Sequence, residues 1–153
     1  MTCGNFFINN KLTYLYEHTQ HTEFPIFTSP TAFVMTNFQN PVKELFFIIK
    51  EGPVQVEING DKSILDKGSV IFLLPGDRAS FFNDHKDPVE IYEMQMQSAS
   101  PDVQRGKSAG PSFVIDWNDM FYKAHERGGV RQLFDRKTVH TNRFDIHITS
   151  LRS

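Results

Sequence analysis

The sequence predicts an all-β domain, a barrel or sandwich of short strands followed by a C-terminal extension. Three observations support this fold class. Short apolar segments alternate with turns that contain Gly, Pro or Asn from residue 32 to residue 98. No part of that stretch has the period of an amphipathic helix. The chain also has 15 Phe but only 1 Trp and 4 Tyr, a composition typical of strands that face a common interior.

The central strands are the most clearly marked. Residues 44–50 (ELFFIIK) are apolar enough to be buried on both faces of a sheet. Residues 54–58 alternate between apolar and polar, and Asn59-Gly60 then predicts a tight hairpin, because both residues tolerate positive φ. The other expected strands are residues 12–16, 32–38, 62–65, 69–74, 79–82, 90–97, 113–115 and 144–151.

The strand expected at residues 90–97 (EIYEMQMQ) has Tyr and Met side chains on one face and Glu and Gln side chains on the other. Residues 98–112 are small and polar and predict a linker. Residues 116–119 predict a turn or a single helical turn, and Gly128-Gly129 predicts a break.

These assignments divide the chain into three parts. Residues 1–31 form an N-terminal arm with strands, and residues 32–98 form the core barrel. Residues 99–153 form a linker and a C-terminal extension that ends in a strand. The last strand has an edge to cover, so we expect it to pair with the barrel or with another molecule.

Charge and composition exclude several function classes. The net charge is −2, but residues 1–104 carry −6 and residues 105–153 carry +4, so the tail is suited to an acidic surface of its own chain or of a partner. No basic stripe or reading helix predicts nucleic-acid binding. Cys3, the single cysteine, excludes an internal disulfide framework. No signal peptide or membrane-spanning run is visible, so we expect a cytoplasmic protein without membrane contact.

Residues 68–83 (GSVIFLLPGDRASFFN) resemble the second sequence motif of the cupin superfamily. Gly68, Gly76 and Asn83 stand at the positions of the family's two glycines and its asparagine, and Ala79 stands where the family has a metal-binding histidine. The resemblance implies a double-stranded β-helix, also described as a jelly-roll barrel.

The first cupin motif is matched less well. Glu44 stands at the position of the family's glutamate, directly before an apolar strand. Asn37 and Gln39 then fall where the family has its two histidines, and Gly52 follows one residue later than the pattern requires. The resemblance therefore places Asn37, Gln39, Glu44 and Ala79 at the positions of the metal ligands.

Two segments of the tail, residues 128–136 (GGVRQLFDR) and 143–151 (RFDIHITSL), resemble the inter-domain segment of bicupins related to ureidoglycine aminohydrolase. In those proteins a similar stretch leads into a second barrel, which carries the metal. The resemblance extends over most of residues 32–153 and is to the first barrel of such a two-barrel protein.

The residues at the metal-ligand positions do not predict a metal centre. A transition metal in an open protein site requires converging imidazole and carboxylate ligands. Asn37 and Gln39 offer neutral amides, Ala79 offers no ligand atom, and Glu44 alone is a poor anchor. We therefore expect no bound metal and no cofactor. Two interpretations of the polar residues stay open, a hydrogen-bonded barrel floor and a site for a small polar ligand.

Three further residues are expected near this pocket. Phe46 and Phe81 are predicted to belong to the core and to line the pocket, since the core face of a small barrel is also its interior wall. Arg78 precedes Ala79 in the turn and is placed near the mouth of the barrel, where it either contacts an anionic ligand or is a simple surface side chain.

Three hypotheses for function follow. The first is a non-catalytic structural or assembly barrel that forms a homodimer through exchanged or paired strands, residues 144–151 among them. The second is a metal-free sensor or carrier of a small polar molecule. The third is a metal-independent enzyme that uses Glu44 as a general base. Fold alone does not choose among them.

Overall fold

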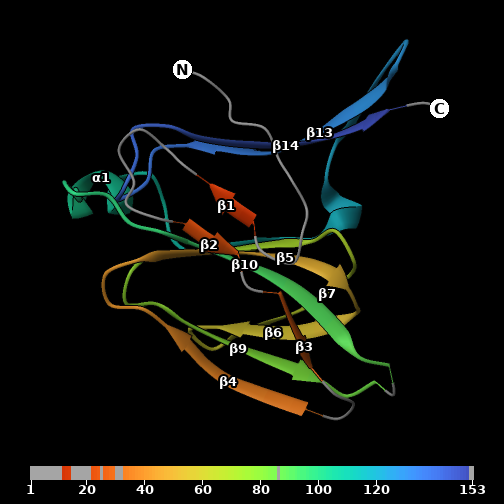
Figure 1. Cartoon of the computed structure of the whole chain (residues 1–153), viewed down its shortest axis with the longest axis horizontal. Coiled ribbons are helices and arrows are strands. Elements are labelled where there is room, and N and C mark those ends of the chain that lie inside the picture. Colours follow the sequence, from red (N-terminus) through yellow and green to blue (C-terminus); the bar gives the residue numbers. More distant parts are fainter. Residues whose placement is uncertain (1–11, 15–21, 25, 30–32, 86, 152–153) are drawn as a thin grey trace.

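The structure is a computed structural model of the chain. It describes residues 12–14, 22–24, 26–29, 33–85 and 87–151, with side chains from residue 38 onward. Two antiparallel sheets form the barrel (Figure 1). The first sheet has the strand order β11-β8-β5-β10-β3. Its strands are β3 (Ile26–Ser29), β5 (Glu44–Glu51), β8 (Val70–Leu73), β10 (Val89–Met96) and β11 (Phe113–Ile115).

The second sheet has the strand order β4-β9-β6-β7. Its strands are β4 (Phe33–Gln39), β6 (Val54–Ile58), β7 (Asp61–Leu65) and β9 (Arg78–Asn83). Asn59 and Gly60 join β6 to β7 with φ values of 50° and 101°, so the predicted positive-φ hairpin is confirmed. The all-β prediction is confirmed as well, and the central strands lie within about two residues of their expected bounds.

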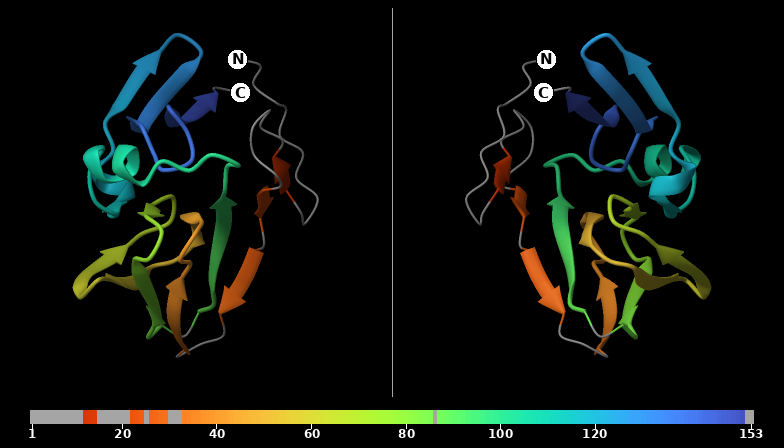
Figure 2. Two further views of the ribbon diagram at one scale, coloured as in Figure 1. Left: turned by 90° about the vertical axis from the view of Figure 1, so that its left-hand side faces the viewer. Right: turned by 90° about the vertical axis from the view of Figure 1, so that its right-hand side faces the viewer.

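The C-terminal extension forms a third sheet, with the order β12-β13-β14. Its strands are β12 (Tyr122–His125), β13 (Gly128–Arg136) and β14 (Phe144–Leu151). Figure 2 shows this sheet on one side of the barrel, with the 3-10 turn η1 (Trp117–Asp119) and the short helix α1 (Val103–Ser108) beside it. In the N-terminal part of the chain, β1 (Leu12–Tyr14) pairs with β2 (Thr22–Phe24).

Three features of this topology differ from the sequence prediction. Helix α1 lies within the stretch interpreted as a linker, where Asp102 caps it by accepting a hydrogen bond from the Arg105 amide. Strand β3, which precedes the predicted start of the barrel, pairs with β10 in the barrel sheet. Gly128-Gly129, predicted as a break, lies inside β13, where a Cβ on Gly129 would come within 2.2 Å of the Tyr122 ring.

The interior of the barrel is filled by apolar side chains from both sheets. Phe38, Phe47 and Phe81 meet edge to face at its centre, with ring centroids 5.2 to 5.4 Å apart. Leucine, isoleucine and valine side chains surround them, and Ala79 lies among these with no exposed surface. The interior is thus packed as a hydrophobic core at the described positions.

A second apolar cluster lies outside the barrel, between the first sheet and the extension. Phe46 and Phe72 from β5 and β8 contact Phe134 and Phe144 from β13 and β14. Strand β5 is therefore buried on both faces, as its apolar run predicted. No helix among the described residues is long and apolar enough to cross a membrane.

We predict that Phe47→Ala destabilises the chain by about 3–5 kcal/mol, because it removes a fully buried ring from the aromatic centre. Urea denaturation followed by circular dichroism measures the loss. Ile64→Ala on β7 is the control, since that side chain is 71% exposed and its truncation is expected to stay within about 0.5 kcal/mol. Equal losses in the two variants would contradict this assignment of the core.

Candidate functional site

The structure separates the residues that were expected to line one pocket. Ala79 and Phe81 are on β9 and face the barrel interior. Gln39 and Arg78 pair across β4 and β9 and line a depression on the outer surface. Asn37 is in β4, at a register shift between Met35 and Phe38, and its side chain lies outside the described residues.

Glu44 and Phe46 are on the opposite face of β5 from the barrel interior. Side chains of a strand alternate between its two faces, and Leu45 and Phe47 are the ones that enter the interior cluster. Phe46 therefore packs in the outer cluster, under the extension. The expectation that Phe46 and Phe81 share a pocket wall is wrong for this reason. The run of residues 44–50 is apolar on both faces, so its pattern did not show which face is the interior.

Glu44 connects the barrel to the extension. Its side chain is fully buried, and Oε1 accepts a hydrogen bond of 2.6 Å from the Val139 amide. The other oxygen, Oε2, is buried with no hydrogen-bond partner among the described residues. Burial raises the pKa of Glu44 above its usual value, against the lowering effects of Thr138 and Val139 beside it.

The segment that receives Glu44, residues 138–142, is held from several sides. The Arg105 guanidinium donates to the carbonyl oxygens of Thr138 and Val139 at 2.7 and 2.6 Å. The Val139 carbonyl also accepts from the Asp102 amide at 2.8 Å, and the Val139 side chain packs where Gly106 leaves room for it. Glu44 thus forms part of a buried structural contact.

His140 belongs to the same contact. Its Nδ1 accepts a hydrogen bond from the Ser98 amide at 3.2 Å, and its Nε2 lies 2.8 Å from the Val42 carbonyl oxygen. An amide N–H only donates and a carbonyl only accepts, so the proton of the ring is on Nε2. The sequence did not single out His140, because none of its neighbours in the chain marks it as a partner of Val42 and Ser98, which are distant in sequence.

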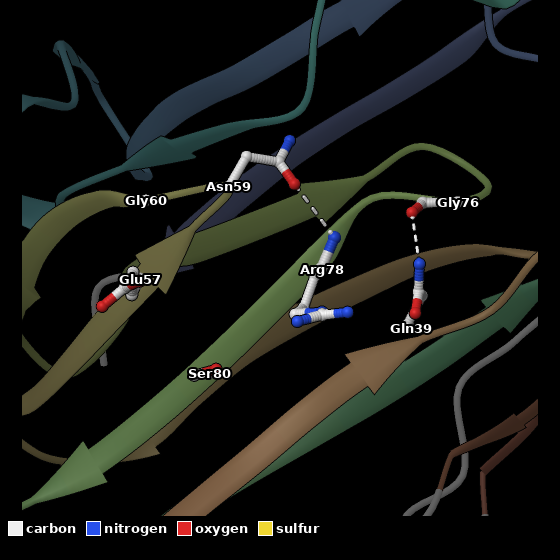
Figure 3. A pocket seen from close by; sticks show the side chains of 7 residues that line it. All are labelled: Gln39, Glu57, Asn59, Gly60, Gly76, Arg78 and Ser80. Atoms are coloured by element: carbon white, nitrogen blue, oxygen red, sulfur yellow. Dashed lines mark hydrogen bonds between the residues drawn. The ribbon is translucent and has the colours of Figure 1, made fainter.

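The depression on the outer surface has a volume of about 400 Å³. Figure 3 shows Gln39 and Arg78 on neighbouring strands at its wall, where the Gln39 amide donates to the Gly76 carbonyl at 2.7 Å and the Arg78 backbone amide donates to Asn59 at 3.2 Å. The other lining residues are Glu57, Gly60 and Ser80. Arg78 is exposed, and its role in ligand binding stays a prediction.

The residues at the metal-ligand positions do not fit a transition metal of the family type. Ala79 places a methyl group in the packed interior, and the Glu44 carboxylate is on the other side of its sheet. Over the described part of the chain, no group of three or more His, Cys, Asp and Glu side chains could hold a metal ion.

A polar chain of three residues enters the interior at one end of the barrel. Glu93 and Gln95 lie opposite Phe47 and Leu45 in the pairing of β10 with β5, so they share the interior face. Lys43 donates to Gln95 at 2.8 Å, and Gln95 donates to Glu93 at 2.8 Å. The alternation of residues 90–97 signalled two different faces, but only the sheet pairing shows that the Glu and Gln face points inward and the Met face outward.

Solved structures similar to this chain include two cupin domains. The cupin domain of Cnp3 from Schizosaccharomyces pombe is 16% identical, with a TM-score of 0.49 over 62% of this chain and 69% of that one. A Cupin 2 conserved barrel domain protein from Salinispora arenicola is also 16% identical, with a TM-score of 0.48 over 62% of this chain and 82% of that one.

A third solved structure, protein Ylba from E. coli, is 11% identical and has a TM-score of 0.56 over 84% of this chain and 60% of Ylba. The chain has the cupin fold. No protein-family model matches the sequence, and no curated protein matches it significantly. Because these identities are low, the likeness shows the cupin fold and leaves activity, ligands and partners to proposal.

We predict that the contribution of Glu44 to the stability of this chain falls as the pH rises above about 4.5, until Glu44 is ionised in the folded state. Its pKa is raised from a reference value of 4.5, so in this window the folded state binds more protons than the unfolded state, and stability decreases with pH. Urea denaturation at a series of pH values measures the slope. Glu44→Gln removes the group that titrates and should reduce this slope.

A second substitution at Glu44 provides a control. Glu44→Ala removes the acceptor as well and leaves the Val139 amide buried without a partner, so it should cost about 1–3 kcal/mol more than Glu44→Gln. If the free energy of unfolding of the wild-type chain depended on pH across this window in the same way as that of Glu44→Gln, the assignment would be contradicted.

Proposed function

We propose that this chain is a non-catalytic cupin barrel with a structural or assembly role, comparable to the first barrel of a bicupin. The observation that supports this most directly is the use of Glu44. The residue that stands at the metal-ligand position of the first motif is buried outside the barrel and holds the extension in place. A cytoplasmic location belongs to the same proposal, since one cysteine provides no disulfide framework.

The two alternatives have less support. A general base must reach the proton that it removes, and the Glu44 carboxylate has no exposed surface. A sensor or carrier requires a cavity for its ligand, whereas Phe38, Phe47 and Phe81 fill the centre of the barrel. The polar chain of Lys43, Gln95 and Glu93 pairs its own groups. These contacts favour a scaffold over a ligand-binding barrel.

Loss of the family-type metal is part of this proposal. We expect elemental analysis of the purified chain to find manganese, iron, nickel and zinc well below one equivalent, because Ala79 and Glu44 do not supply converging ligands. Restoring a histidine by Ala79→His is not expected to create a site, since Glu44 still lies on the other face. Near-stoichiometric metal in the wild-type chain would contradict the proposal.

Assembly is proposed to occur at the extension. Strand β14 pairs with β13 and is at the edge of its sheet among the described residues. Leu151 is 77% exposed and lies opposite Gly128, at the hairpin end of this sheet. Phe121, just before β12, is also 77% exposed, and Figure 1 shows the β12–β13 hairpin projecting from the barrel. An edge strand with exposed apolar neighbours is suited to pairing with the same strand of a second copy.

We therefore expect the wild-type chain to sediment as a dimer at micromolar concentration. Replacing two exposed residues of β14, Thr149→Lys with Leu151→Lys, should shift the equilibrium to monomer, because charges on an edge strand oppose pairing. Ile64→Lys is the matched control, since Ile64 is 71% exposed on the edge strand of the other sheet, and it should remain dimeric. A wild-type monomer, or the same shift in both variants, would contradict pairing through β14.

A further inference from the structure

The guanidinium of Arg131 on β13 lies over two aromatic side chains of different elements. Its guanidinium carbon lies 4.1 Å from the ring centroid of Trp117 in η1 and 4.5 Å from that of Tyr122 in β12. Tyr122 is directly opposite Arg131 in the pairing of the two strands. Cation–π contacts at these distances attract the guanidinium from both rings. The side chain is therefore held in one orientation.

Two glycines allow the rings to approach. A Cβ on Gly68, where φ is +90°, would lie 2.4 Å from the Trp117 ring, and one on Gly129 would lie 2.2 Å from the Tyr122 ring. Any larger residue at either position would push its ring away from the backbone. The arrangement thus depends on two separate parts of the chain, the turn before β8 and the start of β13.

Among the described residues, the guanidinium of Arg131 lacks the partners that comparable arginines have. Its Nε is buried with no hydrogen-bond partner, and its side chain takes part in none of the hydrogen bonds or ion pairs between described residues. By contrast, Arg105 and Arg136 donate to backbone carbonyls, and Arg143 binds Asp135 and Asp145. Because Nε is shielded from solvent, the Nη groups are the donors of Arg131 that an acceptor from outside the described residues can reach.

The geometry selects the kind of acceptor. Arginine stacks its planar guanidinium on aromatic rings. With two ring centroids 4.1 and 4.5 Å from the guanidinium carbon, hydrogen bonds from the Nη groups are directed to the edge of the guanidinium, in its own plane. A carboxylate is planar and pairs with two guanidinium N–H groups in one plane. A tetrahedral phosphate projects oxygens above and below that plane, toward the rings. The edge of the Arg131 guanidinium is therefore better matched to a carboxylate than to a phosphate.

We propose that Trp117, Tyr122 and Arg131 form a carboxylate-binding site on the extension, separate from the barrel interior. The carboxylate is that of a small organic acid or of an acidic residue in a second copy of the chain. The charge distribution supports an acidic ligand, because residues 105–153 carry +4 and residues 1–104 carry −6. If the second copy supplies the carboxylate, the site is part of the proposed assembly surface.

Trp117 is the only tryptophan of the chain, so its fluorescence reports directly on the site. The full chain is titrated with acetate and with succinate, with inorganic phosphate as the tetrahedral comparison and chloride at matched ionic strength. We expect a saturable change in Trp117 emission with the carboxylates and a weaker response to phosphate. Arg131→Lys, which keeps the charge and loses the planar fork, should weaken carboxylate binding at least about tenfold.

Arg127→Lys is the matched control, because Arg127 is an exposed arginine in the turn between the same two strands, and its titration should equal that of the wild-type chain. If Arg131→Lys does not fold, the wild-type chain still tests the proposal through the ¹H–¹⁵N resonances of arginine Nε–H groups. One of these should be protected from solvent exchange in the free protein and should shift with added carboxylate.

The source of the carboxylate is distinguished by dilution. A second copy supplies the carboxylate if Trp117 emission changes with protein concentration in the wild-type chain but not in Arg131→Lys. Added acetate should then reverse the change seen at high protein concentration. Emission that responds to acetate or succinate at every protein concentration assigns the carboxylate to a small acid. The proposal is overturned if neither response occurs, if phosphate binds as strongly as the carboxylates, or if Arg131→Lys titrates like the wild-type chain.

Discussion

Strands β5 and β8 are buried on both faces, and most of the structure follows from the need to cover both. A sheet with two apolar faces needs a layer on each side. The second barrel sheet covers the inner face, where Phe47 packs against Phe38 and Phe81. The extension covers the outer face, where Phe46 and Phe72 pack against Phe134 and Phe144. The extension is therefore a required part of this fold and contributes to its core.

This double burial explains the unusual position of Glu44. Its place in β5 is on the outer face, so the carboxylate is enclosed between the barrel and the extension and must find a partner there. The Val139 amide is that partner, and the Arg105 guanidinium and His140 fix the same segment. The Glu44 carboxylate thus connects two layers of the structure, the barrel and the extension.

The interior of the barrel and the surface of the extension differ in how far their side chains find partners within the described chain. The barrel is filled by rings and branched aliphatic side chains, and its polar groups, Lys43, Gln95 and Glu93, are paired with one another. The extension instead presents Phe121 and Leu151 to solvent and holds Arg131 without a hydrogen-bonding partner among the described residues. The contacts with other molecules that we propose are therefore on the extension and not in the barrel.

The sequence by itself determined the all-β class, the Asn59-Gly60 hairpin and the double burial of residues 44–50, because turn chemistry and periodicity are local properties. Only the tertiary structure decided which face of β5 is the barrel interior, and with it the place of Glu44 and Phe46. Shifting a strand by one residue exchanges its faces, and a run that is apolar on both carries no signal for the choice. The stack at Arg131 likewise joins residues distant in sequence, so only the packing of the extension could reveal it.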